Sequence, residues 1–134
     1  MKYTELQAII GEERDKFPMK FAFNEDQLQE GLKELGVTKA EVVSIGAGGF
    51  IRKTDKADFI AMFDSSQARL KEAFTDDAFM VDALIYELGN HEYCITMDDS
   101  DALGALGLDE SDPQVSRCLK EAKRLYNEWQ EING

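Results

Sequence analysis

The side chains best suited to chemistry lie in one short segment, residues 86–94, which contains the only histidine of the chain. If this segment is helical, Glu87 and His91 share one face, and Asn90 and Cys94 share another, because residues four apart are neighbours on a helix. A Cys–His pair can supply a nucleophile and its base, and Glu, His and Cys can all bind a metal ion. The candidates for a ligand-binding site or a structural polar cluster are Tyr86, Glu87, Asn90, His91, Glu92, Tyr93 and Cys94.

Three interpretations of this segment remain open. A thiolate mechanism needs an oxyanion hole, for which the sequence offers no feature, and a metal site would have a single imidazole. We therefore expect a polar network that fixes a helix end in the core, with no catalytic residue, no metal and no cofactor. The alternative function is a small-ligand binding protein that holds a nucleotide or metabolite in residues 86–94. A small hydrolase that uses His91 and Cys94 comes third.

Two other motifs only partly match known ligand sites. The glycine-rich stretch 46–49 is followed by Ile51 where a dinucleotide fingerprint needs glycine, so it predicts a hairpin turn. Residues 99–104 with Glu110 align in part with a calcium loop, but Leu103 stands where a side-chain oxygen is needed. We interpret this stretch as a short helix capped by aspartates.

The charge of the chain is strongly uneven. The net charge is −12, yet residues 1–71 carry 12 acids and 11 bases, and residues 117–134 carry 3 acids and 4 bases. Residues 72–116 carry 12 acids and no Lys or Arg. Such a block repels nucleic acid and attracts basic surfaces. The alternative interpretation is that these acids only keep the protein soluble. The residues predicted to contact a partner are Asp76, Asp77, Asp98, Asp99, Asp101, Asp109, Glu110 and Asp112.

These features predict a non-catalytic binding protein rather than an enzyme. The expected partner is a protein with a basic, nucleic-acid-binding surface. We expect neither direct nucleic-acid binding nor membrane association. The chain is expected to be a monomer or a homodimer. No run of about 18 apolar residues is present and the N-terminus is too polar for a signal peptide, which favours the cytoplasm. Cys94 and Cys118 are expected to be free thiols.

The elements that must position these residues predict an α+β fold. We expect a single domain over residues 1–134, in which a small antiparallel or mixed sheet of about three strands packs against five to six helices. Thr4 with Gln7, and Asn24 with Gln27, are typical of capping boxes. The expected helices cover about 4–16, 24–36, 54–75, 78–93, 98–107 and 113–132, and the expected strands cover 19–23, 42–45 and 50–52.

The helix expected over residues 78–93 is apolar on most sides, which places it at the centre of the fold with Leu84 and Leu88 buried. Gly89 within it predicts a close helix crossing or an early helix end. The last helix carries an apolar stripe that should dock within this chain or across a dimer: Val115, Cys118, Ala122, Leu125, Trp129 and Ile132.

Two stretches also support a family resemblance. The first is Phe21-Ala22-Phe23-Asn24 with Gln27, Glu30, Gly31, Leu35 and Gly36. The second is Tyr86-Glu87-Leu88 with Asn90-His91-Glu92-Tyr93-Cys94, Thr96 and Asp101-Ala102-Leu103 through Leu106-Gly107-Leu108. Together they resemble an uncharacterised family of small acidic proteins from phages, plasmids and integrative elements of gut-type bacteria. The resemblance implies a mobile-element setting, in which small acidic proteins include antirestriction proteins and CRISPR inhibitors, several of which mimic nucleic acid. It implies no catalytic residue.

Overall fold

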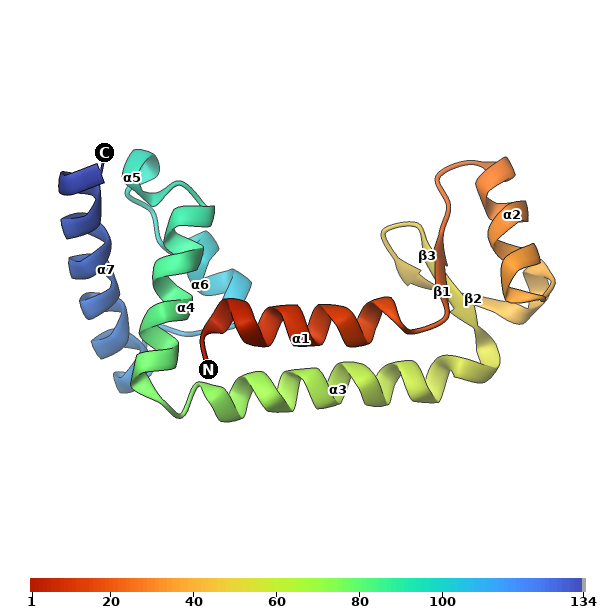
Figure 1. The fold of residues 1–134 in the computed structure, drawn as a ribbon, viewed down its shortest axis with the longest axis horizontal. Coiled ribbons are helices and arrows are strands. Elements are labelled where there is room, and N and C mark those ends of the chain that lie inside the picture. The colour runs from red at the N-terminus through yellow and green to blue at the C-terminus, as the bar shows by residue number, and fades with distance from the viewer. Residues whose placement is uncertain (134) are drawn as a thin grey trace. The chain divides into compact units, whose positions relative to one another are not determined.

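The computed structural model describes residues 1–133 and confirms an α+β fold with a three-stranded antiparallel sheet (Figure 1). Two short 3-10 turns, Lys39–Glu41 and Lys53–Asp55, precede β2 and α3. The longer elements are α1 (Tyr3–Asp15), β1 (Met19–Phe21), α2 (Glu25–Leu35), β2 (Val42–Gly46), β3 (Gly49–Arg52), α3 (Lys56–Ala73), α4 (Asp77–Asn90), α5 (Tyr93–Thr96), α6 (Ser100–Leu106) and α7 (Pro113–Asn133).

These elements form two compact units. The helical unit comprises residues 1–8 and 69–133, and the sheet unit comprises residues 9–68. The expectation of one domain over the whole chain stays a prediction. No helix within residues 1–133 has the length and apolar character needed to cross a membrane.

In the sheet unit, the strand order is β1-β3-β2, so β3 pairs with both neighbours. Helix α2 covers one face of this sheet, where Leu32 and Leu35 pack with Phe50 from β3. Gly31 allows this close packing, because a Cβ atom at that position would lie 2.7 Å from the Phe50 ring. The small sheet is thus stabilised by an apolar contact that a larger residue in α2 would disrupt.

The glycine-rich stretch forms the predicted hairpin between β2 and β3. Gly46 and Gly48 have φ values of 91° and 79°, which side chains with a Cβ rarely adopt. Gly48 and Gly49 also accommodate aromatic rings: an added Cβ would lie 2.9 Å from the Phe23 ring and 2.8 Å from the Phe21 ring, respectively. These glycines therefore serve a tight turn and close ring packing.

Two predicted helix starts have different outcomes. Asn24 caps α2 by accepting a hydrogen bond from the backbone N–H of Gln27 (2.8 Å), as predicted. The reciprocal bond of a capping box is not formed, because the Gln27 side chain accepts from Phe23 N–H and not from Asn24 N–H. The capping box at Thr4 is wrong, because α1 already begins at Tyr3. Gln7 instead donates a hydrogen bond to the Tyr3 hydroxyl (2.6 Å).

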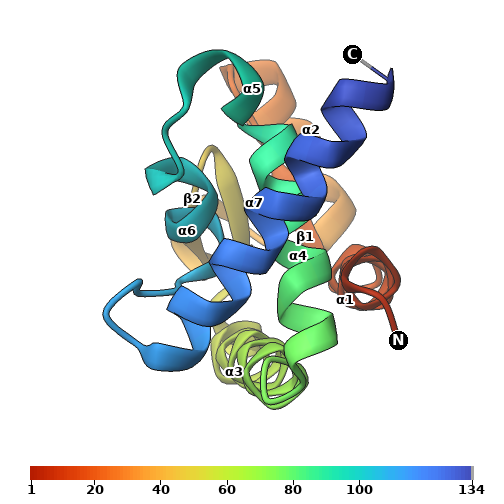
Figure 2. The same ribbon diagram turned by 90° about the vertical axis from the view of Figure 1, so that its left-hand side faces the viewer.

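Helix α4 is the core of the helical unit, as its all-round apolar sequence predicted. Ala83, Leu84 and Leu88 are completely buried. Helix α7 runs beside α4 in the same direction: the Cys118 thiol lies 3.9 Å from the Asp77 carbonyl at the start of α4 (Figure 2). Near the other end, a Cβ at Gly89 would lie 3.8 Å from the Tyr126 ring, which is ordinary contact distance.

The expected helix end at Tyr93 is wrong. Helix α4 ends at Asn90, and the next turn is interrupted at Glu92, whose φ of 56° is left-handed. Tyr93 then begins the separate helix α5. Asn90 and Cys94 consequently do not share one helix face, whereas Glu87 and His91 still meet because His91 is the C-cap of α4.

Candidate functional site

A polar cluster surrounds Glu87, a buried carboxylate with 4% of its surface exposed. Its Oε1 accepts a hydrogen bond from the Tyr3 hydroxyl (2.9 Å). Its Oε2 accepts one from Asn90 Nδ2 (3.3 Å). The same oxygen lies 3.2 Å from His91 Nε2, but this buried nitrogen forms no hydrogen bond within residues 1–133. Both carboxylate oxygens are thus engaged by side chains of the same chain, which offsets the cost of burying the charge.

Helix α1 supplies the part of this cluster that the sequence did not reveal. Burial, together with the hydrogen bond to Glu87, raises the pKa of Tyr3 well above its ordinary range, so the hydroxyl remains a donor. The Tyr3 backbone N–H also donates to Asp82 Oδ2 (2.9 Å). Two carboxylates of α4 therefore hold the first turn of α1, which supports the structural interpretation of Glu87 and His91.

The other members of the 86–94 segment have separate surroundings. The Tyr86 side chain is exposed, and its ring contacts that of Tyr3 at 5.6 Å between centroids. Tyr93 is buried against Tyr126, while Glu92 and Cys94 are exposed. The predicted cluster is therefore divided, and no interaction between His91 and Cys94 is found within the described residues.

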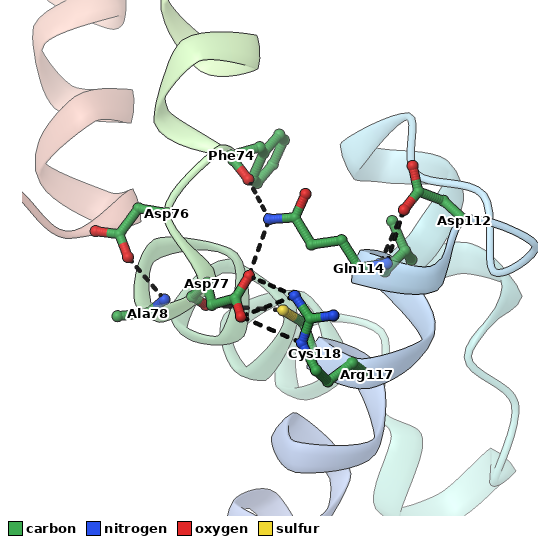
Figure 3. Close-up of polar contacts among 9 residues, drawn as sticks. Phe74, Asp76, Asp77, Ala78, Asp112, Gln114, Arg117 and Cys118 are labelled. Atoms are coloured by element: carbon green, nitrogen blue, oxygen red, sulfur yellow. Dashed lines mark hydrogen bonds and ion pairs between the residues drawn. The ribbon is translucent and has the colours of Figure 1, made fainter.

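The predicted acidic residues at the start of α4 have structural partners (Figure 3). Asp76 caps the helix by accepting a hydrogen bond from Ala78 N–H (3.0 Å). Asp77 forms an ion pair with Arg117 (2.9 Å) and accepts a hydrogen bond from Gln114 (3.1 Å), both on α7. The hydrogen bond from Arg117 lowers the pKa of Asp77.

The remaining predicted acids lie around the starts of α6 and α7. Three accept hydrogen bonds from backbone N–H groups two residues later: Asp98 from Ser100, Asp109 from Ser111 and Asp112 from Gln114. These bonds lower the pKa values of Asp98 and Asp109.

Asp99 forms an ion pair with Lys123 of α7 (2.6 Å). The side chains of Asp101 and Glu110 are exposed and form no hydrogen bond or ion pair within residues 1–133, although Glu110 interacts electrostatically with Lys123. Six of the eight acids thus have a local hydrogen-bond or ion-pair partner, and two do not.

The acidic charge is concentrated in one unit. Over the whole sequence, residues 1–8 and 69–134 carry 16 acids and 7 bases, a net charge of −9, while residues 9–68 carry 11 acids and 8 bases, a net charge of −3. Seven of the eight predicted acids are exposed, and Asp99 is half-buried. The surface of the helical unit therefore carries the stronger negative field.

A groove of about 530 Å³ lies along α4 and α7. Val81 and Cys118 contribute to its lining, and Arg117, Lys120 and Arg124 lie along its α7 side. Burial raises the pKa of the Cys118 thiol, so this sulfur stays protonated and a poor nucleophile. Within residues 1–133, no group of three or more His, Cys, Asp or Glu side chains is placed to hold a metal ion.

The fold and this arrangement of charge define a small acidic α+β protein with a polar cluster around the buried Glu87. Residues 2–128 match a family of unknown function, DUF7659, and the chain belongs to that family. No curated protein and no solved structure matches the chain. The mobile-element setting stays a prediction.

Proposed function

We propose that this chain is a non-catalytic, acidic binding protein whose helical unit occupies the basic surface of a nucleic-acid-handling enzyme. In a mobile-element setting, the consequence would be inhibition of a defence enzyme of the restriction or CRISPR type. The observation that carries the proposal is the unequal charge of the two units, −9 against −3.

The arrangement of carboxylates also supports this proposal. Most of the predicted acids are fixed by helix caps, turns or ion pairs, so their charges have defined positions on the surface. Fixed charges lose little conformational freedom when a partner binds. A one-sided negative field also accelerates encounter with a basic surface.

Asp101 and Glu110 offer the most direct test, because the side chain of neither forms a hydrogen bond or ion pair within residues 1–133. Asp101 lies in the first turn of α6, so the thermal stability of the variant is measured as well. The immobilised chain is first used to capture a binding protein from a bacterial lysate at low salt. The affinity of the purified partner is then measured for the wild type and for the Asp101→Asn/Glu110→Gln variant over a range of salt concentrations. The proposal predicts slower association for the variant, weaker binding and a shallower salt dependence.

A matched control removes two exposed charges from the sheet unit through Glu30→Gln and Asp64→Asn. This control should bind as the wild type does, and double-stranded DNA should compete with the chain for the partner. Binding that is indifferent to salt, to DNA and to both variants would contradict the proposal. Equal weakening by the two variants would show that net charge matters but the helical unit does not.

A further inference from the structure

Helix α7 extends beyond the end of α4, and its apolar stripe continues without cover. The stripe is buried at Val115, Cys118 and Ala122, where α7 packs beside α4. Trp129 and Ile132 follow Tyr126, which lies beside Gly89 near the end of α4, and they are 58% and 83% exposed. The predicted docking face is therefore satisfied within the chain over its first half only.

Helix α5 lies at the same end of the helical unit (Figures 1 and 2). Cys94 N–H donates to the Tyr126 hydroxyl (3.3 Å), and the rings of Tyr93 and Tyr126 meet edge-to-face. On this short segment Ile95 and Met97 are 74% and 66% exposed. We define the apolar tip as Ile95, Met97, Trp129 and Ile132.

The backbone holds α5 in a defined conformation. Glu92 and Met97 flank the helix, and both have a φ of 56°, a left-handed conformation that residues with a Cβ disfavour. The contacts of Tyr93 and Cys94 with Tyr126 hold α5 against α7. An apolar group presented in this way has less conformational freedom to lose on binding.

The charge around the apolar tip indicates what covers it. Residues 92–98 and 127–133 contain four acids and no Lys or Arg. Lys123 lies 5.6 Å from the centre of the Tyr93 ring, but its charge is paired with Asp99. Glu128 forms an ion pair with Arg124 (2.8 Å). Two copies of this end would bring like charges together, whereas a basic partner would meet opposite charges. Exposed apolar groups with a polar rim are typical of protein-binding surfaces.

We infer that the apolar tip is the anchor by which the helical unit binds a basic protein surface that has apolar side chains at its centre. The inference rests on the proposed function and names the apolar tip as the main site of direct contact with the partner. Long-range charge then speeds encounter, while burial of Trp129 and its neighbours slows dissociation.

Trp129 is the only tryptophan of the chain, so its fluorescence reports on the apolar tip without a label. The probe is a leucine–lysine peptide that forms an amphipathic helix, and the reference probe is a lysine–serine peptide of equal charge. The leucine–lysine peptide should shift the Trp129 emission to the blue in a saturable, salt-sensitive titration. It should bind at least about tenfold more tightly than the reference peptide.

The Ile95→Ser/Met97→Ser variant removes two exposed apolar side chains and should weaken that binding by at least about tenfold while far-UV circular dichroism stays unchanged. Phe23→Ser is the matched control, because Phe23 is 78% exposed in the sheet unit. It should leave the titration unaltered.

Other outcomes would overturn the inference in distinguishable ways. Equal binding of both peptides with no change in emission would show recognition by charge alone, and the proposed function would stand without the apolar tip. Failure of both peptides to bind would contradict the inference about the apolar tip and the proposed function. A blue shift that grows with protein concentration in the absence of peptide, accompanied by sedimentation as a dimer, would show that a second copy covers the tip.

Discussion

The two units are stabilised by different means. In the helical unit, α4 is surrounded by other elements, and a buried carboxylate is satisfied by partners on α1 and α4. In the sheet unit, an apolar cluster of Leu32, Leu35 and Phe50 depends on Gly31, which lets the Phe50 ring approach α2. Gly48 and Gly49 make room for the exposed rings of Phe23 and Phe21. The helical unit, which contains the deeply buried helix α4, thus also carries most of the negative charge of the chain.

The largest effect is expected from a charge in the centre of the helical unit. Leu84 and Leu88 are completely buried, so Leu84→Asp or Leu88→Asp places an unpaired carboxylate where no partner is available, at a cost of several kcal/mol. The variant should lose the hydrogen-exchange protection of the α4 amides. Retained protection and an unchanged melting midpoint would show that the core has been misplaced.

A smaller effect is expected at the buried carboxylate. Glu87→Ala leaves Tyr3 and Asn90 without their acceptor and should lower the free energy of unfolding by about 1–3 kcal/mol. His91→Ala removes one of the contacts and should cost about 1 kcal/mol. Chemical denaturation gives both values. A variant of Glu87 as stable as the wild type would show that the cluster contributes nothing to the helical unit.

The corresponding test of the sheet unit is Gly31→Ala. The added methyl group would lie 2.7 Å from Phe50 and 3.1 Å from Lys20 Cβ, so overpacking should destabilise the fold by about 1–3 kcal/mol. Gly104→Ala in α6 is the contrasting change, because a Cβ added there would have no neighbour within 4 Å and alanine favours a helix. It should stabilise by up to about 1 kcal/mol. Equal effects of the two substitutions would contradict the packing account.

The smallest effect concerns alkaline pH. Burial raises the pKa of Cys118 above its ordinary value of 9.0, so the folded chain keeps a proton that the unfolded chain loses. The resulting stability is present below pH 9 and is lost as the pH rises through the higher folded value, by at most about 1.4 kcal/mol per pH unit. Cys118→Ala should flatten this decline. If the free energy of unfolding falls equally with pH in the wild type and in the variant, a group other than Cys118 causes the decline.

The sequence predicted what depends on local pattern. The cap at Asn24, the hairpin at the glycines and the burial of Leu84 and Leu88 follow from turn chemistry and periodicity, and all are confirmed. The partnership of Tyr3 with Glu87 joins residues 84 positions apart, and no local signal encodes it. The end of α4 was misplaced because the left-handed conformation of Glu92 is not favoured by its residue type.

The same distinction applies to the candidate site. The excess of acids was visible from composition, but which acids serve as caps depends on the helix starts at Asp77 and Pro113. Asp112, for example, accepts hydrogen bonds from Gln114 and Val115 N–H groups, so its charge and its role in α7 cannot be separated by sequence alone. The exposure of Trp129 depends on where α4 ends, which requires the tertiary structure.

The most direct test of the proposed difference between the units is a hydrogen-exchange comparison of the free chain and the chain bound to its captured basic partner. The account predicts new protection at residues 92–101 and 127–133, in the helical unit, and unchanged exchange over residues 9–68. Protection confined to the hairpin end of the sheet unit, around Phe21 and Phe23, would contradict it and assign binding to the exposed aromatic rings there.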